Sequence, residues 1–185
     1  MSKKIYVILT QTGTVPARII KFITKAPYNH TSITCDEGLY EIYSFCRKFK
    51  RTPIPAGFVN EPDVGVFEMF NSVPCEVYGF DVTENQYEKY LELITHFKNS
   101  SKTYGYNVLG LLALAFGIQI HRKNHFICSQ WVAKILTECG IAKFDKDLLL
   151  VRPDDFRYLE NAKLVYQGDL RRLDEIKMEL AHSAT

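Results

Sequence analysis

The sequence lacks the cysteine pattern of a disulfide-stabilised or zinc-binding domain. It has five cysteines, an odd number, and none of them form a CxxC pair. At least one thiol is therefore free, which favours a reducing compartment, and we expect a cytoplasmic protein. His121 and His125 lie close to Cys128, but no second cysteine–histidine pair completes a set of four ligands. The sequence predicts no metal site and no cofactor.

An excess of charge of one sign is also missing. The chain has 23 basic and 21 acidic residues, which leaves a formal net charge of +2. This overall balance gives no electrostatic reason to expect nucleic acid or an anionic membrane as a partner. No GxGxxG or GxxxxGK[ST] pattern is present, so a nucleotide phosphate loop has no support.

No apolar run is long enough to cross a bilayer, which takes roughly 20 residues. The most apolar stretch, 109–120, falls short of that length, and the sequence predicts no transmembrane segment. A buried helix is the expected structure for this stretch. An acyl-chain-binding wall or an interfacial helix is the alternative, because Gly110 and Gly117 leave room for a ligand.

The length of 185 residues suits a single domain, 1–185, in which 170–185 form a terminal helix or tail. Strands are predicted at 5–10, 30–34, 40–45, 75–82 and 163–166, and helices at 16–24, 84–97, from 128 onward, and at 173–181. Proline punctuates 51–74, which we expect to be a loop with short extended pieces that covers a substrate cleft. Helices gather at 84–140 apart from most strands, so we predict an α+β fold in which an antiparallel sheet packs with helices.

Cys128 is the strongest candidate for a catalytic nucleophile. The apolar residues Trp131, Val132, Ile135 and Leu136 repeat at helical spacing after it, so Cys128 falls at the start of an amphipathic helix. Unpaired backbone N–H groups and the positive end of the helix dipole stabilise a thiolate there. The alternative is a buried core cysteine, since Cys128 lies on the same apolar stripe.

A thiolate needs an imidazole partner, and the imidazole needs an acceptor for its second nitrogen. His30 begins one strand and Glu41 lies on the next, across the turn at 35–38. If the hairpin brings them to the same face, Glu41 orients His30. The alternatives are a histidine bonded to a turn carbonyl and a solvated strand carboxylate.

Three segments, 29–33 (NHTSI), 40–45 (YEIYSF) and 128–132 (CSQWV), together resemble the circularly permuted branch of the NlpC/P60 superfamily of papain-like enzymes. The similarity is greatest to the YiiX/YaeF-like permuted amidases and covers about residues 5–168. The order of histidine before cysteine distinguishes this branch. The resemblance implies a permuted papain-like α+β fold with Cys128 as nucleophile, His30 as base and Glu41 as orienter. An oxyanion hole would then use the N–H of Cys128 and one further donor, for which the candidates are Tyr6, Gln11 and Tyr28.

We therefore expect a cysteine hydrolase that cleaves an amide or ester bond through an acyl-Cys128 intermediate. The expected substrate is a small molecule, a peptide or an acyl lipid. Two alternatives stay open: an acyltransferase that uses a lipid or amine acceptor, and a non-catalytic binding module with the same fold. The sequence leaves the oligomeric state undetermined.

Overall fold

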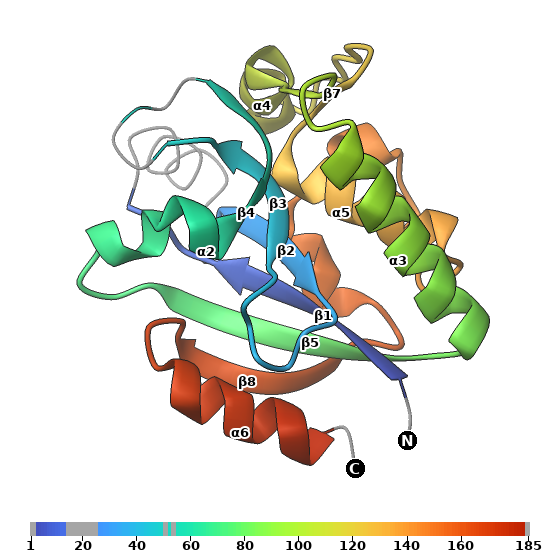
Figure 1. The fold of residues 1–185 in the computed structure, drawn as a ribbon. Helices are drawn as coiled ribbons and strands as arrows, with labels where there is room; N and C mark the ends of the chain where they lie inside the picture. Colours follow the sequence, from blue (N-terminus) through green and yellow to red (C-terminus); the bar gives the residue numbers. More distant parts are fainter. Residues whose placement is uncertain (1–2, 14–25, 50–51, 53–54, 184–185) are drawn as a thin grey trace.

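The computed structural model describes residues 3–13, 26–49, 52 and 55–183 (Figure 1). Its main element is a six-stranded antiparallel sheet with the strand order β4-β3-β2-β1-β5-β8. The strands are β1 Lys3–Thr10, β2 His30–Thr34, β3 Tyr43–Arg47, β4 Ala56–Asn60, β5 Pro74–Val82 and β8 Lys163–Asp169. The α+β class and the antiparallel sheet are confirmed. The predicted helix at 16–24 lies outside the described residues.

The α-helices are α2 Glu61–Val64, α3 Glu84–Asn99, α4 Val108–Ala115, α5 Cys128–Glu138 and α6 Leu173–Ser183. Three 3-10 helices, Val66–Met69, Leu148–Leu150 and Pro153–Tyr158, and the short parallel pair β6 Gly105–Tyr106 and β7 His125–Phe126 complete the described structure. The predicted start of α3 is confirmed, because Thr83 and Gln86 form a reciprocal capping box. The terminal helix is present as α6.

The sheet is covered on both faces, and alternation along β1 decides which side chain meets which cover. Ile5, Val7 and Leu9 belong to the core that contains residues of α3 and α5. Tyr6 and Ile8 belong to the core on the other face, where α6 packs. Figure 1 shows α3 and α5 together on one side of the sheet and α6 beside β8.

Trp131 fixes α5 to the sheet. Its side chain is fully buried, and its ring lies 5.6 Å from Phe45, 5.4 Å from Phe58 and 5.5 Å from Phe97, measured between centroids. Aromatic pairs at these separations add roughly 0.5–1.5 kcal/mol each beyond the burial of their area. This cluster joins β3, β4, α3 and α5, so the start of α5 has a fixed place relative to the sheet.

Two predicted elements between 40 and 74 differ from the structure. Strand β3 begins at Tyr43 rather than at 40, because the Asp36 carboxylate accepts hydrogen bonds from the N–H groups of Gly38, Tyr40 and Glu41 and holds 36–41 as a turn. The segment 51–74, predicted as a loop with short extended pieces, contains the strand β4 and also the helix α2, which was not predicted. Within the described chain, no helix combines the length and apolarity needed to cross a membrane.

The prediction of a buried helix at 109–120 is wrong. Helix α4 ends at Ala115, and Gly117 follows in a left-handed conformation with φ 71°. Several apolar side chains of α4 are exposed. The physical reason is that α3, α5 and α6 already occupy the sheet faces, which leaves α4 at the end of the molecule beside β7 (Figure 1).

Candidate active site

Cys128 is the first residue of α5, as predicted, and polar side chains hold that helix end in place. The Ser129 hydroxyl donates to the Val151 carbonyl at 2.6 Å, and Gln130 Nε2 donates to the Leu149 carbonyl at 2.8 Å. Gln130 Oε1 also accepts from the Ile127 N–H at 3.4 Å. The Cys-Ser-Gln sequence thus combines a thiol with the two side chains that anchor the first helical turn. Cys128 itself is only 3% exposed.

His30 is the first residue of β2, and its neighbour Asn29 fixes the approach to the strand. The Asn29 N–H donates to the Thr10 carbonyl at 3.1 Å, and Asn29 Nδ2 donates to the Thr12 carbonyl at 3.1 Å. These bonds hold the strand start beside the end of β1. The His30 side chain lies near enough to the Cys128 thiol for each group to shift the pKa of the other.

The carboxylate that contacts His30 is Glu61, the first residue of α2. His30 Nε2 lies 2.6 Å from Glu61 Oε1. The Glu61 side chain is 2% exposed and that of His30 is 12% exposed. Among the described residues, the second carboxylate oxygen of Glu61 has no hydrogen-bond partner. A carboxylate this deeply buried is stable only beside positive charge, so Glu61 favours the imidazolium form of His30.

The three groups shift one another's ionisation. Burial lowers the pKa of His30, but the negative charges of Glu61 and the Cys128 thiolate outweigh burial and raise that pKa to about 10. Burial raises the pKa of Cys128, yet the charge and hydrogen bond of His30 outweigh it and leave the pKa below its ordinary value. Both shifts therefore favour the thiolate form of Cys128 paired with the imidazolium form of His30.

Geometry assigns the two nitrogens of His30 different roles. Because Nε2 is engaged by Glu61, Nδ1 is the nitrogen left to exchange a proton with the Cys128 sulfur. The backbone N–H groups of Thr31 and Ser129 also stabilise the thiolate and contribute to its lowered pKa.

The other four thiols behave differently. Burial raises the pKa of Cys139 to about 11 and that of Cys75 to about 12. Burial also raises the pKa of Cys35 and of Cys46. Cys128 is thus the one thiol of the five whose surroundings favour the nucleophilic form.

The prediction that Glu41 orients His30 is wrong. Glu41 precedes β3 in the turn that Asp36 organises, its side chain is 54% exposed, and its Oε1 lies 3.2 Å from Lys98 Nζ. Glu61 was missed because it lies inside the proline-punctuated segment 51–74, which we expected to be mainly a loop. The signal was a short apolar run, 57–59, followed by Asn-Glu-Pro, which places a carboxylate where a strand passes into a helix.

Of the three residues predicted as candidate oxyanion donors, the structure excludes one and leaves two untested. Tyr6 is excluded, since its side chain lies on the face opposite α5 and its hydroxyl is 3.4 Å from the Leu180 carbonyl and 3.3 Å from Ser183 Oγ. Tyr28 lines a pocket with Cys128, and its role stays a prediction. Gln11 donates its backbone N–H to the Pro74 carbonyl at 2.9 Å. This bond does not involve the side chain, so the role of the Gln11 side chain as an oxyanion donor stays a prediction as well.

The pocket at Cys128 is lined mainly by apolar side chains. Its lining comes from 26–29, from the inner side of α4, from the start of α5 and from the start of the last 3-10 helix: Ala26, Tyr28, Asn29, Leu111, Leu114, Ile127, Cys128, Ser129, Arg152 and Pro153. The Arg152 guanidinium donates to the Leu114 carbonyl at 3.2 Å, which ties α4 to this pocket. The thiolate therefore opens toward a surface suited to an apolar group.

Among the described residues, no group of three or more His, Cys, Asp or Glu side chains is arranged to hold a metal ion. Comparison with protein-family models gave no match for this chain, and comparison with curated proteins gave none either.

Proposed function

We propose that this protein is a cysteine hydrolase that cleaves an amide or ester bond, with Cys128 as nucleophile, His30 as acid and base, and Glu61 as the residue that orients His30. The observation that carries the proposal is the placement of His30 between a helix-start cysteine and a buried carboxylate. An imidazole held at one nitrogen by a carboxylate and facing a thiol with the other is the arrangement that nucleophilic catalysis requires.

The reaction follows from these positions. The Cys128 thiolate attacks the carbonyl carbon, and the oxygen takes up the electron pair of the C=O bond beside backbone N–H groups. The intermediate collapses, the bond to the amine or alcohol breaks, and the His30 imidazolium gives that leaving group its proton. Neutral His30 then removes a proton from water, which attacks the thioester. The acid leaves, and the thiolate and imidazolium are restored.

The same arrangement supports the family resemblance drawn from the sequence. A histidine on an early strand, a later cysteine at a helix start and an antiparallel sheet between two helical covers match what a permuted papain-like fold of the NlpC/P60 type requires. We propose this fold with one change to its site, since Glu61 takes the role first given to Glu41.

The test uses p-nitrophenyl acetate, because it reports both acylation and turnover. We expect release of nitrophenolate and an acetyl group found on the Cys128 peptide by mass spectrometry. Cys128→Ala should remove both signals, while the matched variant Cys35→Ala should keep them. Acetylation of another cysteine, or turnover that survives Cys128→Ala, would overturn the assignment.

A second arm separates hydrolysis from acyl transfer. The acetyl-enzyme is challenged with water alone and with an added primary amine or alcohol. Free acetate without any acceptor supports hydrolysis. Product that forms only when the acceptor is present would make the protein a transferase, and a stable protein without acylation at all would favour the non-catalytic binding module.

A further inference from the structure

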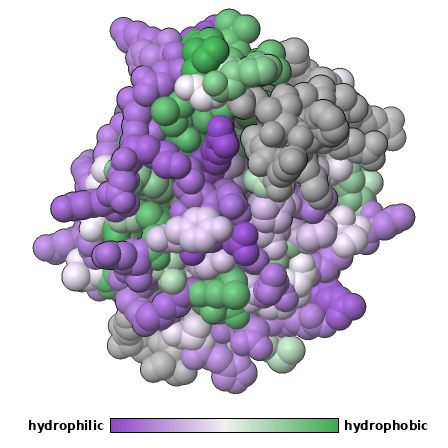
Figure 2. Space-filling model, turned by 180° about the vertical axis from the view of Figure 1, so that it is seen from behind, coloured by the Kyte–Doolittle hydropathy of each residue, from purple (hydrophilic) through white to green (hydrophobic). Residues whose placement is uncertain are grey.

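Helix α4 presents an apolar face to solvent at one end of the molecule. Twelve large hydrophobic side chains are exposed in the described structure, and five of them fall between 108 and 118. They are Val108 at 46%, Leu109 at 55%, Leu112 at 52%, Phe116 at 71% and Ile118 at 56% exposed. A scattered set would need no explanation, but a cluster of this density marks an interaction surface. Figure 2 shows apolar residues gathered at the top of the molecule, which is the α4 end in Figure 1.

The helix is apolar on two sides, and each side has a different exposure. Val108, Leu109 and Leu112 lie within about 100° of arc, at 3.6 residues per turn, and form the outer face. Leu111 and Leu114 point the other way and line the Cys128 pocket. A helix that is apolar all round belongs in a protein core or in a membrane environment. Because its outer face is exposed, α4 is not a core helix.

A spanning role is excluded by length. Eight helical residues extend about 12 Å, whereas the hydrocarbon core of a bilayer is about 30 Å thick. A short apolar helix at the surface of a protein can instead lie in the interfacial region of a membrane, where only its outer face is buried.

Positive charge lies directly beside this face. The exposed segment His121, Arg122 and Lys123 follows α4 and returns to its start, because the Ile120 carbonyl accepts from Asn107 Nδ2 at 2.9 Å and β7 pairs with β6 just before the helix. In the described part of the chain, the side chains of Arg122 and Lys123 form no ion pair or hydrogen bond.

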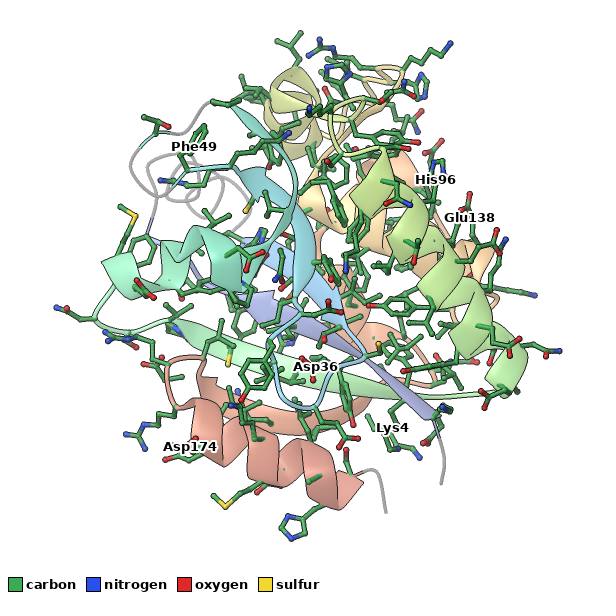
Figure 3. The ribbon with its side chains drawn as sticks, in the orientation of Figure 1. Lys4, Asp36, Phe49, His96, Glu138 and Asp174 are labelled. Carbon is green, nitrogen blue, oxygen red and sulfur yellow. The ribbon has the colours of Figure 1, made fainter. Side chains whose placement is uncertain are left out.

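The sequence around α4 also excludes negative charge. From 93 to 137 the chain contains no aspartate or glutamate, although it contains Lys98, Lys102, Arg122, Lys123 and Lys134. Of the acidic residues labelled in Figure 3, Asp36 and Asp174 lie in the lower half of the molecule, whereas Glu138 lies in the upper half. The stretch of chain that contains α4 is therefore basic, although the whole chain has a nearly balanced net charge.

We propose that the outer face of α4 and the basic segment 121–123 form a docking surface for an anionic phospholipid bilayer. The apolar side chains enter the acyl boundary, and Arg122 and Lys123 contact lipid phosphates. Charge complementarity decides between a membrane and a second copy of this chain, because two copies joined face to face would bring two unpaired basic segments together. Docking places the mouth of the Cys128 pocket near the bilayer surface, since Leu111 and Leu114 of the same helix line that pocket.

The test is co-sedimentation of the full chain with vesicles of phosphatidylcholine alone and of phosphatidylcholine mixed with phosphatidylserine. We expect the protein to pellet with the mixed vesicles, to stay in solution with the neutral ones, and to be released by high salt. Arg122→Gln with Lys123→Gln should weaken binding about fivefold for each charge removed. Leu112→Ser with Phe116→Ser should abolish it.

Matched controls lie on β8, on α6 and in the turn between them, away from α4. Arg172→Gln with Lys177→Gln removes two charges there, and Leu164→Ser with Met178→Ser removes two exposed apolar side chains. Both should bind like the parent. Circular dichroism checks the fold, and the charge variant keeps the test valid if the apolar variant does not fold. Cys128→Ala should also bind like the parent, so docking and catalysis are tested separately.

Three outcomes would overturn the proposal. The first is a parent protein that stays in solution with both vesicle types. The second is equal binding to the two compositions, or binding unchanged by the Arg122 and Lys123 substitutions. The third is a parent dimer, detected by sedimentation velocity, that Leu112→Ser with Phe116→Ser dissociates while no vesicle binding occurs, because that result assigns the face to a second copy.

Discussion

Glu61 and Glu41 have the same kind of side chain, but Glu61 is buried and Glu41 is exposed. Glu61 is buried against His30, where little water screens its charge, whereas Glu41 is half exposed beside the half-exposed ammonium of Lys98. An exposed ion pair of the second kind contributes little to stability or to the ionisation of other groups. The burial of a carboxylate, rather than its proximity in sequence, decides whether it can control the proton of His30.

The first prediction compares the two glutamates directly. Glu61→Gln removes the charge that stabilises the His30 imidazolium, so the pKa of His30 should fall and the pKa of Cys128 should rise. Below its pKa, a thiol loses reactive thiolate about tenfold for each unit by which that pKa rises. Alkylation of Cys128 by iodoacetamide at neutral pH, followed by peptide mass spectrometry, should slow about tenfold or more.

Glu41→Gln is the matched control and should leave the alkylation rate of Cys128 unchanged. If the two substitutions slow the reaction equally, the orienting role does not belong to Glu61. Alkylation of Cys35, Cys46, Cys75 and Cys139 in the same samples reports any general opening of the fold.

The second prediction concerns stability and pH. The pKa of His30 is raised from 6.5 in the unfolded chain to about 10 in the folded protein. Its protonation therefore contributes stability that is fully present below the unfolded pKa and is lost as pH rises through about 10. The lowered pKa of Cys128 acts in the opposite sense, and its contribution is lost as pH falls through the folded value.

Urea unfolding of the parent and of His30→Asn at several pH values measures this contribution. The difference in unfolding free energy between the two proteins should shrink as pH is raised from neutral to above 10. A difference that stays constant over this range would show that His30 does not hold a proton in the folded state.

At the level of elements, the start of α5 depends on side chains that bond to a distant segment. Ser129 and Gln130 reach the carbonyls of 149–151, so the position of Cys128 is set by a contact between the helix and a later loop. The dipole of α5 then acts on a thiol whose place is fixed.

The third prediction follows from that anchor. Ser129→Ala leaves the buried Val151 carbonyl without its donor and should cost about 1–3 kcal/mol of unfolding free energy. Cys128 alkylation should slow as well, because the helix start is less firmly held. Ser101→Ala is the matched control and should change neither quantity. Urea denaturation and the alkylation rate are the two measurements, and an unaltered free energy for Ser129→Ala would contradict the anchoring role.

The sequence allowed the elements that carry Cys128 and His30 to be predicted, because local patterns determine them. The stripe of Trp131, Val132 and Ile135 sets α5, and the run after His30 sets β2. Glu61 could not be placed in this way. Its contact with His30 depends on β4 and β3 forming the sheet edge next to β2, and strand order is a property of the whole sheet.

The exposure of α4 was also beyond local prediction. An apolar stretch has the same sequence pattern whether it is buried or exposed. Only the assembled structure shows that other helices already cover both faces of the sheet. The absence of acidic residues from 93 to 137 was visible in the sequence, but a balanced total charge concealed it.

At the scale of the whole molecule, α6 closes the second face of the sheet. Ile176 and Leu180 are fully buried against Tyr6, Ile8 and their neighbours. This second core lies on the side away from α5, so it supports β1 from behind without contacting the pocket.

The fourth prediction tests that support. Leu180→Ala removes buried methyl groups and leaves a cavity, which should lower the unfolding free energy by about 2–5 kcal/mol. Met178→Ala, at a side chain that is 58% exposed on the same helix, should have a small effect. Thermal denaturation followed by circular dichroism compares the two variants, and equal midpoints would show that α6 adds little to the fold.

The reacting groups come from three distant parts of the chain: His30 from β2, Glu61 after β4 and Cys128 from α5. Contacts between residues so far apart in sequence form slowly, because the intervening loops must close first. We therefore expect a refolding chain to form helices α3 and α5 before it forms the site. Iodoacetamide can be added at successive times after dilution from denaturant. It should label Cys128 faster than in the unfolded chain only once the sheet has assembled. The labelling rate of this thiol therefore reports the last step of folding.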